Sequence, residues 1–264
     1  MPASQRTWIF TIALIIFNIL FFWIKPEGKA MTIVSDILPI LCALVALGGT
    51  ALAVRSFGTG NRARLAWILL LTGVTLFFCA ETINGFLEII LNGDVNDGFP
   101  ILADYFRMTA YIPVLAGLLM LVFGYKKSRF SFGSKRNFIF GLLGLSLIAF
   151  TFVHQLLLSI LRDADTGNLA KSVYIYYFAG GLLITFPAAL LVYISSLYKK
   201  AWILSPWRYL AMGLLCLTIF TIEHSYLSWN NTYGSGNFLE VFRNLGYLLV
   251  AIGGLYQKEL IESV

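Results

Sequence analysis

Long apolar runs separated by short polar breaks make up almost the whole chain. Eight such runs lie near residues 7–24, 33–54, 65–91, 100–125, 136–161, 171–198, 206–228 and 238–258. Each approaches or exceeds the roughly 20 residues that a helix needs to cross the hydrocarbon core of a bilayer. Turn-forming residues fill breaks such as 58–61 and 233–237. The pattern therefore predicts an all-α protein with about eight transmembrane helices.

The composition agrees with this prediction. Hydrophobic residues make up 59% of the chain and charged residues only 12%, against about 45–50% and about 25% in soluble domains. Because so few charges cannot cover a water-exposed surface, the lipid bilayer is the first expected partner. The net charge of +6 does not indicate nucleic-acid binding, since the basic residues lie at the ends of the runs rather than in one patch. The runs are also far longer than the ten-residue alternating strands of a membrane barrel.

Lysine and arginine residues concentrate in alternate breaks and near both termini. These residues are Arg6, Arg55, Arg62, Arg64, Lys126, Lys127, Arg129, Lys135, Arg136, Lys199, Lys200, Arg208 and Lys258. Connections of membrane proteins that are rich in Lys and Arg stay in the cytoplasm. We therefore expect both termini on the cytoplasmic side of the inner cell membrane.

Two parts of the chain resemble each other. The residues Asp104-Tyr105-Phe106-Arg107 with Tyr111 in the fourth run correspond to Glu240-Val241-Phe242-Arg243 with Tyr247 in the eighth. Aligning the third run with the seventh by its acids places Glu81 on Glu223. These matches predict two four-helix halves, 1–127 and 128–264. Since four is an even number, both halves would insert the same way up, as parallel repeats do.

Charged residues inside the runs are the candidates for chemistry, because a charge at the centre of a bilayer costs about 2.5–3.5 kcal/mol even on the most lenient scale. In the predicted topology they gather in the outer third of the spans, together with tyrosines and the only two histidines. The candidate ligand-binding residues are Glu81, Glu88, Asp104, Arg107, Tyr111, His154, Glu223, His224, Glu240, Arg243 and Tyr247. No acidic residue lies in the cytoplasmic halves of the spans.

Three interpretations of this group remain open. The first is structural, because Asp104 with Arg107 and Glu240 with Arg243 have the i, i+3 spacing of ordinary helix ion pairs. The second is a cavity for a small polar or amphipathic ligand, walled by tyrosines that otherwise form an interfacial belt: Tyr111, Tyr174, Tyr176, Tyr177 and Tyr247. The third is a metal site, because imidazole with carboxylate suits first-row metals; its residues would be His154, His224, Glu81 and Glu223. No other cofactor is expected, and familiar catalytic motifs are absent.

One stretch resembles a known family. Ala80-Glu81-Thr82-Ile83 and Glu88, followed by Phe99-Pro100-Ile101-Leu102-Ala103-Asp104-Tyr105 and Tyr111, is similar to two spans of bacterial multi-span sensory membrane domains. Those domains are joined to diguanylate cyclases or histidine kinases. Asn84 and Gly85 stand where that family usually has a tryptophan. The resemblance implies a membrane-embedded sensor.

The expected function is therefore a sensory module that binds a small ligand from the outer side and passes a helix movement inward. Its partner would be a cytoplasmic signalling protein or a second copy of the chain. The first alternative is a transporter or channel for a small solute or ion, since carboxylates inside spans also occur there. An enzyme acting within the membrane is the third hypothesis.

Overall fold

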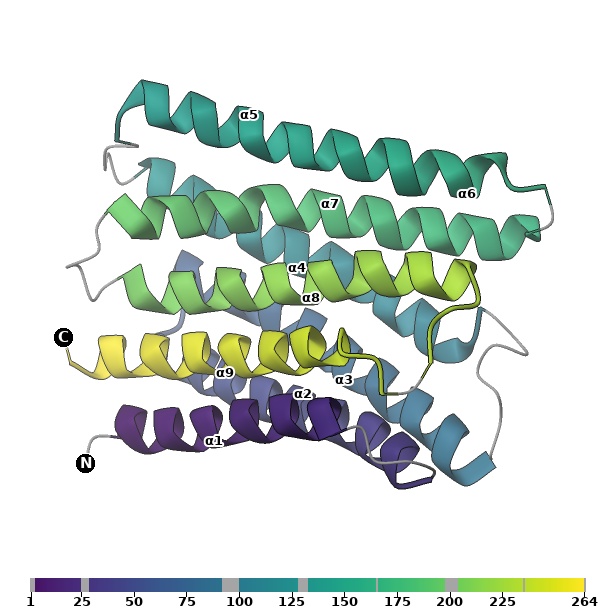
Figure 1. The fold of residues 1–264 in the computed structure, drawn as a ribbon. Coiled ribbons are helices and arrows are strands. Elements are labelled where there is room, and N and C mark those ends of the chain that lie inside the picture. The colour runs from purple at the N-terminus through teal and green to yellow at the C-terminus, as the bar shows by residue number, and fades with distance from the viewer. Residues whose placement is uncertain are drawn as a thin grey trace.

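The computed structural model describes residues 3–24, 29–91, 100–127, 133–164, 166–197, 204–234 and 236–263. Almost all of them are helical. The helices are α1 (Ala3–Ile24), α2 (Lys29–Ser56), α3 (Arg62–Leu91), α4 (Leu102–Lys127), α5 (Lys135–Phe152), α6 (Leu158–Arg162), α7 (Asn168–Leu197), α8 (Ser205–Trp229) and α9 (Glu240–Glu262). A π-helical segment, η2 (Val153–Leu157), joins α5 to α6. These three run on as one rod, so the described residues form eight helical rods (Figure 1).

The prediction of an all-α, multi-span membrane protein is confirmed. In the described part of the chain, α2, α3, α4, the α5–α6 rod, α7 and α8 are long and apolar enough to cross a membrane. Helix α1 contributes a shorter apolar stretch, Thr11–Ile24. Helix α9 is not among the six. Its charged residues Glu240 and Arg243 are buried inside the bundle, toward the other helices, whereas Lys258 and Glu262 near its end are not buried.

Six helices form a closed ring. Going around it, α2 packs on α3, α3 on α4, α4 on α7, α7 on α8, α8 on α9, and α9 again on α2. Helix α1 lies outside the ring against α9, and α6 touches α7 (Figure 1). Helix α5 has no buried residue. The core therefore belongs to the ring, and the α5–α6 rod is peripheral.

Helix α1 begins and α9 ends at the same end of the bundle (Figure 1). Most basic residues of the described helix ends lie there, since α2 ends with Arg55 in its last turn and α3 begins at Arg62. Likewise α4 ends at Lys127 and α5 begins at Lys135. We call this the basic end of the bundle.

Two pairs of helices pack through equivalent contacts. A Cβ atom added at Gly213 of α8 would lie 2.6 Å from the Gly246 carbonyl oxygen and 2.9 Å from Val250 Cγ2 in α9. Gly73 of α3 meets the same atoms of Ala110 and Val114 in α4. Aligning Arg107 of α4 with Arg243 of α9 pairs Ala110 with Gly246 and Val114 with Val250. The contact therefore makes Gly73 the counterpart of Gly213.

A second contact gives the same register. Gly117 of α4 faces Ala66 and Leu70 of α3, and Gly253 of α9 faces Pro206 and Leu210 of α8. Leu70 lies three positions before Gly73, and Leu210 lies three positions before Gly213. Continued along α3 and α8, this register pairs Glu81 with Thr221. The alignment of Glu81 with Glu223 is therefore wrong, because it lies two positions out of the packing register.

The contact between α2 and α9 gives a test of this packing. A Cβ at Gly49 would lie 2.5 Å from the Ala251 carbonyl oxygen, whereas a Cβ at Gly48 has no other atom within 4 Å. We expect Gly49→Ala to force α2 and α9 apart and to cost about 1–3 kcal/mol of unfolding free energy. The neighbouring control Gly48→Ala should leave stability equal or slightly higher. Unfolding in detergent measures both variants, and equal stability of the two would contradict the close approach.

Candidate functional site

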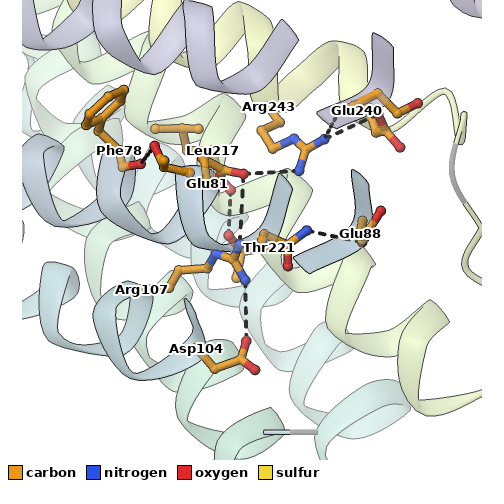
Figure 2. A network of polar contacts seen from close by, with 12 residues as sticks. Phe78, Glu81, Glu88, Asp104, Arg107, Leu217, Thr221, Glu240 and Arg243 are labelled. Carbon is orange, nitrogen blue, oxygen red and sulfur yellow. Dashed lines mark hydrogen bonds and ion pairs between the residues drawn. The ribbon is translucent and has the colours of Figure 1, made fainter. Parts of the chain in front are cut away.

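A buried network of charges joins α3, α4 and α9 at the end of the bundle opposite the basic end (Figure 2). At its centre is Glu81, which is only 4% exposed. Its Oε2 lies 3.3 Å from Nη1 of Arg243 and 3.9 Å from Nη2 of Arg107. The Tyr247 hydroxyl donates a hydrogen bond of 2.9 Å to Oε1. One carboxylate therefore holds an arginine from each half of the chain.

Each arginine also contacts an acid one turn earlier in its own helix. Arg107 Nη1 lies 3.3 Å from Asp104 Oδ1, and Arg243 Nη2 lies 3.2 Å from Glu240 Oε2. These are the i, i+3 pairs that the spacing predicts. The structural interpretation of those four residues and the interpretation as a polar cluster thus describe one network.

The two outer acids are anchored in the same way. The Ile101 amide donates 2.8 Å to Asp104 Oδ2, and the Tyr177 hydroxyl donates 2.6 Å to Oδ1. For Glu240 the donors to Oε1 are the Gly236 amide and the Tyr233 hydroxyl, each at 3.1 Å. Each acid therefore binds one amide that precedes its own helix and one tyrosine from elsewhere.

Tyr233 lies in the connection between α8 and α9, outside the spans. Burial, together with the negative Glu240 carboxylate, raises the pKa of Tyr233 well above its ordinary value. The phenol therefore stays protonated at neutral pH and keeps donating to Glu240.

A small cavity of about 20 Å³ borders the network. This is room for about one water molecule. Most of its lining residues form pairs in the two helix registers set by the glycine contacts: Phe77 with Leu217, Glu81 with Thr221, Arg107 with Arg243, and Tyr111 with Tyr247. The cavity therefore lies where residues in equivalent packing positions of α3–α4 and of α8–α9 meet, and we call it the shared cavity. Of the paired positions, only Glu81 supplies a carboxylate.

The sequence interpretation missed several residues of this site. Asp36 of α2 is 7% exposed, and its Oδ2 accepts no hydrogen bond from the described residues. It packs against Gly85, one turn from Glu88, which accepts a 3.2 Å hydrogen bond from Asn84. The isolated acid within the apolar run 33–54 was the available signal. The Ser35 carbonyl, which accepts a 3.1 Å hydrogen bond from Arg243, has no sequence signal.

Three sequence candidates lie outside the network. Glu223 and His154 line a separate open groove between α8 and the η2–α6 segment. Because Glu223 comes two residues after Thr221, about 100° per residue turns its side chain some 200° away from the shared cavity. The His224 ring packs on Phe220 and Tyr233, with centroid distances of 5.2 and 4.2 Å.

The four proposed metal ligands do not form one cluster. Glu81 lines the shared cavity, whereas Glu223 and His154 line the open groove. Within the ranges that the structure describes, no three His, Cys, Asp or Glu residues lie together closely enough to hold a metal ion.

The aromatic wall of the predicted pocket consists of helix contacts. Tyr111 packs edge-on against Phe77, with ring centroids 5.8 Å apart. The Tyr176 hydroxyl donates 2.9 Å to the Met108 carbonyl oxygen. Tyr174 and Tyr177 are buried in the bundle. These tyrosines therefore lie within the bundle rather than in a belt around it.

Exchanging the two equivalent positions tests the shared site. Glu81→Thr removes the acid that faces two buried guanidinium groups, and we expect it to cost about 3–5 kcal/mol of unfolding free energy. Thr221→Glu adds a second carboxylate to the same cavity and should also destabilise. In the double variant the acid faces both arginines from the other half, so much of the loss should be restored. Unfolding in detergent measures all three, and additive losses would contradict the equivalence of Glu81 and Thr221.

Comparison with known proteins gives no name for this arrangement. No family model matches the chain, and neither a curated protein nor a solved structure matches it. What the site does must be inferred from its own geometry.

Proposed function

We propose that this chain is a sensory, signal-transducing module of the inner cell membrane, built from eight transmembrane helices. Two parallel four-helix halves, 1–127 and 128–264, make up the module. The repeated contacts of α3 with α4 and of α8 with α9 support this division. The basic end of the bundle would face the cytoplasm with both termini, so the charged network would lie near the outer surface.

The observation that carries the proposal is the position of Glu81 between Arg107 and Arg243. This carboxylate ties the first half to the second, and both arginines are largely buried. Three acids of the network face two arginines, so the whole group has one negative charge in excess. A small ligand or proton that neutralised an acid would change the electrostatic attraction that holds Arg107 and Arg243, and with it the contact between the two halves. A two-state element that is biased in this way is what a membrane sensor needs.

The polar groups of the described bundle favour a sensor over a transporter. In this conformation the cavity of about 20 Å³ admits neither a solute nor a ligand larger than water, so the event sensed would be protonation of an acid, or ligand binding once the helices have moved apart. Toward the basic end, no acid comes before the last turns of the described helices, where Glu259 and Glu262 lie. A continuous polar pathway across the bundle would therefore need a second conformation. The signal would instead pass along the helices to a cytoplasmic partner or a second copy.

Proton-coupled transport or conduction is the alternative, and one observation favours it. Asp36 is buried beside the network with a carboxylate oxygen that no described residue binds. Ionisable groups of this kind form proton relays in membrane transporters.

Proton flux into liposomes separates the two functions. If the chain is a sensor, liposomes that contain it should acidify no faster than empty ones, as read with an enclosed pH-sensitive dye. If it transports, flux should appear, and Glu81→Gln should abolish it. The control Glu223→Gln changes an acid outside the network and should retain that flux. Flux with this pattern would replace the sensor proposal by the alternative.

Movement of the halves provides a second test. Spin labels on cysteines at Arg62 of α3 and Ser263, just after α9, report the distance between the halves at the basic end. We expect Glu81→Gln to shift or broaden this distance distribution, because the carboxylate no longer carries the charge that holds both arginines. The control Glu223→Gln should match the unchanged protein. Identical distributions in all three proteins would contradict a switch at Glu81.

A further inference from the structure

An open groove outside the network carries charged residues that no part of the described structure satisfies. It has a volume of about 620 Å³, within the range of about 300–1,000 Å³ usual for ligand sites. One wall is the η2–α6 segment with His154, Gln155, Ser159 and Arg162, and the other is α8 with Glu223 and Tyr226. The shared cavity is thus small and internally paired, whereas this groove is large and open.

The π-helical segment η2 lies at the groove. A π turn inserts one extra residue into the helix, and such turns are frequent at functional sites. Gln155 lies within this segment, and Ser159 and Arg162 follow in α6. All three line the groove.

Arg162 and Glu223 have no ion pair or side-chain hydrogen bond with any described residue. The neighbouring acid Asp163 is already engaged, since the Trp229 indole donates 2.7 Å to its Oδ2. The groove therefore presents one free cation and one free anion within the described chain. A ligand that satisfies both must itself carry a negative and a positive group.

The position of the groove on the rod suggests where such a ligand comes from. Arg162 ends α6, and Glu223 lies six residues, or about 9 Å, before the end of α8. On the side of the groove toward the basic end, α5 exposes Leu147, Ile148 and Phe150, each more than half exposed. Polar groups at the helix end with apolar surface deeper along the rod match the order of headgroup and acyl chain in a lipid.

We propose that this groove binds the headgroup of a zwitterionic aminophospholipid, with its phosphate on Arg162 and its ethanolamine arm folded back so that the ammonium group reaches the deeper Glu223. The acyl chains lie along the exposed apolar side chains of α5. His154 and Gln155 supply hydrogen-bond donors for the remaining phosphate and ester oxygens, whereas the Ser159 hydroxyl already donates to the Gln155 carbonyl oxygen. The proposal is independent of the function suggested for the charged network.

Native mass spectrometry of the detergent-solubilised protein, titrated with dihexanoyl phosphatidylethanolamine, tests the site. Arg162→Gln and Glu223→Gln should each weaken binding about tenfold or more, because each removes a charge-assisted hydrogen bond. Neither change breaks a described interaction, so both variants should keep the thermal stability of the unchanged protein. The matched controls Arg136→Gln and Glu259→Gln, at the basic end, should bind as the unchanged protein does.

Further arms of the titration distinguish the ligand classes. Phosphatidylglycerol of the same chain length, which lacks the ammonium group, should bind more weakly than phosphatidylethanolamine and should not respond to Glu223→Gln. Weakening by Arg162→Gln alone would mark a phosphate site, and weakening by Glu223→Gln alone would mark an amine site; either result would overturn the zwitterion. Glycerophosphoethanolamine without acyl chains should compete poorly. Equal competition by it would overturn the lipid assignment in favour of a soluble zwitterion.

Discussion

Burial of ionised side chains among apolar helices is the constraint on which the rest of this structure depends. A charge at bilayer depth is costly unless an opposite charge and hydrogen bonds compensate it. Glu81 obtains that compensation from two arginines and a tyrosine on neighbouring helices. Because those partners belong to α4 and α9, the ring must hold both helices at fixed distances from α3. Close glycine contacts between helices provide this spacing. One example is Gly73 of α3, which packs against α4.

The same cost accounts for the difference between the two halves. A second carboxylate at position 221 would set four acids of the network, in place of three, against its two arginines. Thr221 instead satisfies its hydroxyl by donating 2.9 Å to the Leu217 carbonyl oxygen of its own helix. The acid of this half, Glu223, stands two residues further on and faces an open groove. The packing contacts of α3 with α4 and of α8 with α9 are thus equivalent, whereas their charges are unequal.

Much of the fold was predictable because hydropathy and helix spacing act locally. The apolar runs, the two i, i+3 ion pairs and the meeting of Arg107 with Arg243 at one level follow from positions along single helices. The rotation of α8 relative to α3 was not predictable in this way, because it depends on small packing residues such as Gly73 and Gly213 rather than on the more conspicuous acids. Matching Glu81 to Glu223 by residue type therefore placed a charge on the wrong face. Tyr233 was missed for a related reason, since a residue in a turn reaches Glu240 only once α8 and α9 are packed.

Helix α5 has no buried residue. Its insertion into the bilayer is therefore a separate matter from the packing of the other helices. Within Lys135–Arg162, an 18-residue stretch has a mean hydropathy of 1.9, yet only 11% of that stretch is buried against other helices. This rod is consequently held in place largely by solvation in lipid. Its contacts with the ring are a small cluster around η2 and α6 and the packing of Phe138 on Tyr193 of α7. The ring can close without it, as expected when helices first insert independently and associate afterwards. Along most of α5, where no residue is buried, the bilayer requires hydrophobic side chains but no particular shape, whereas the buried residues of α9 must also fit their neighbours.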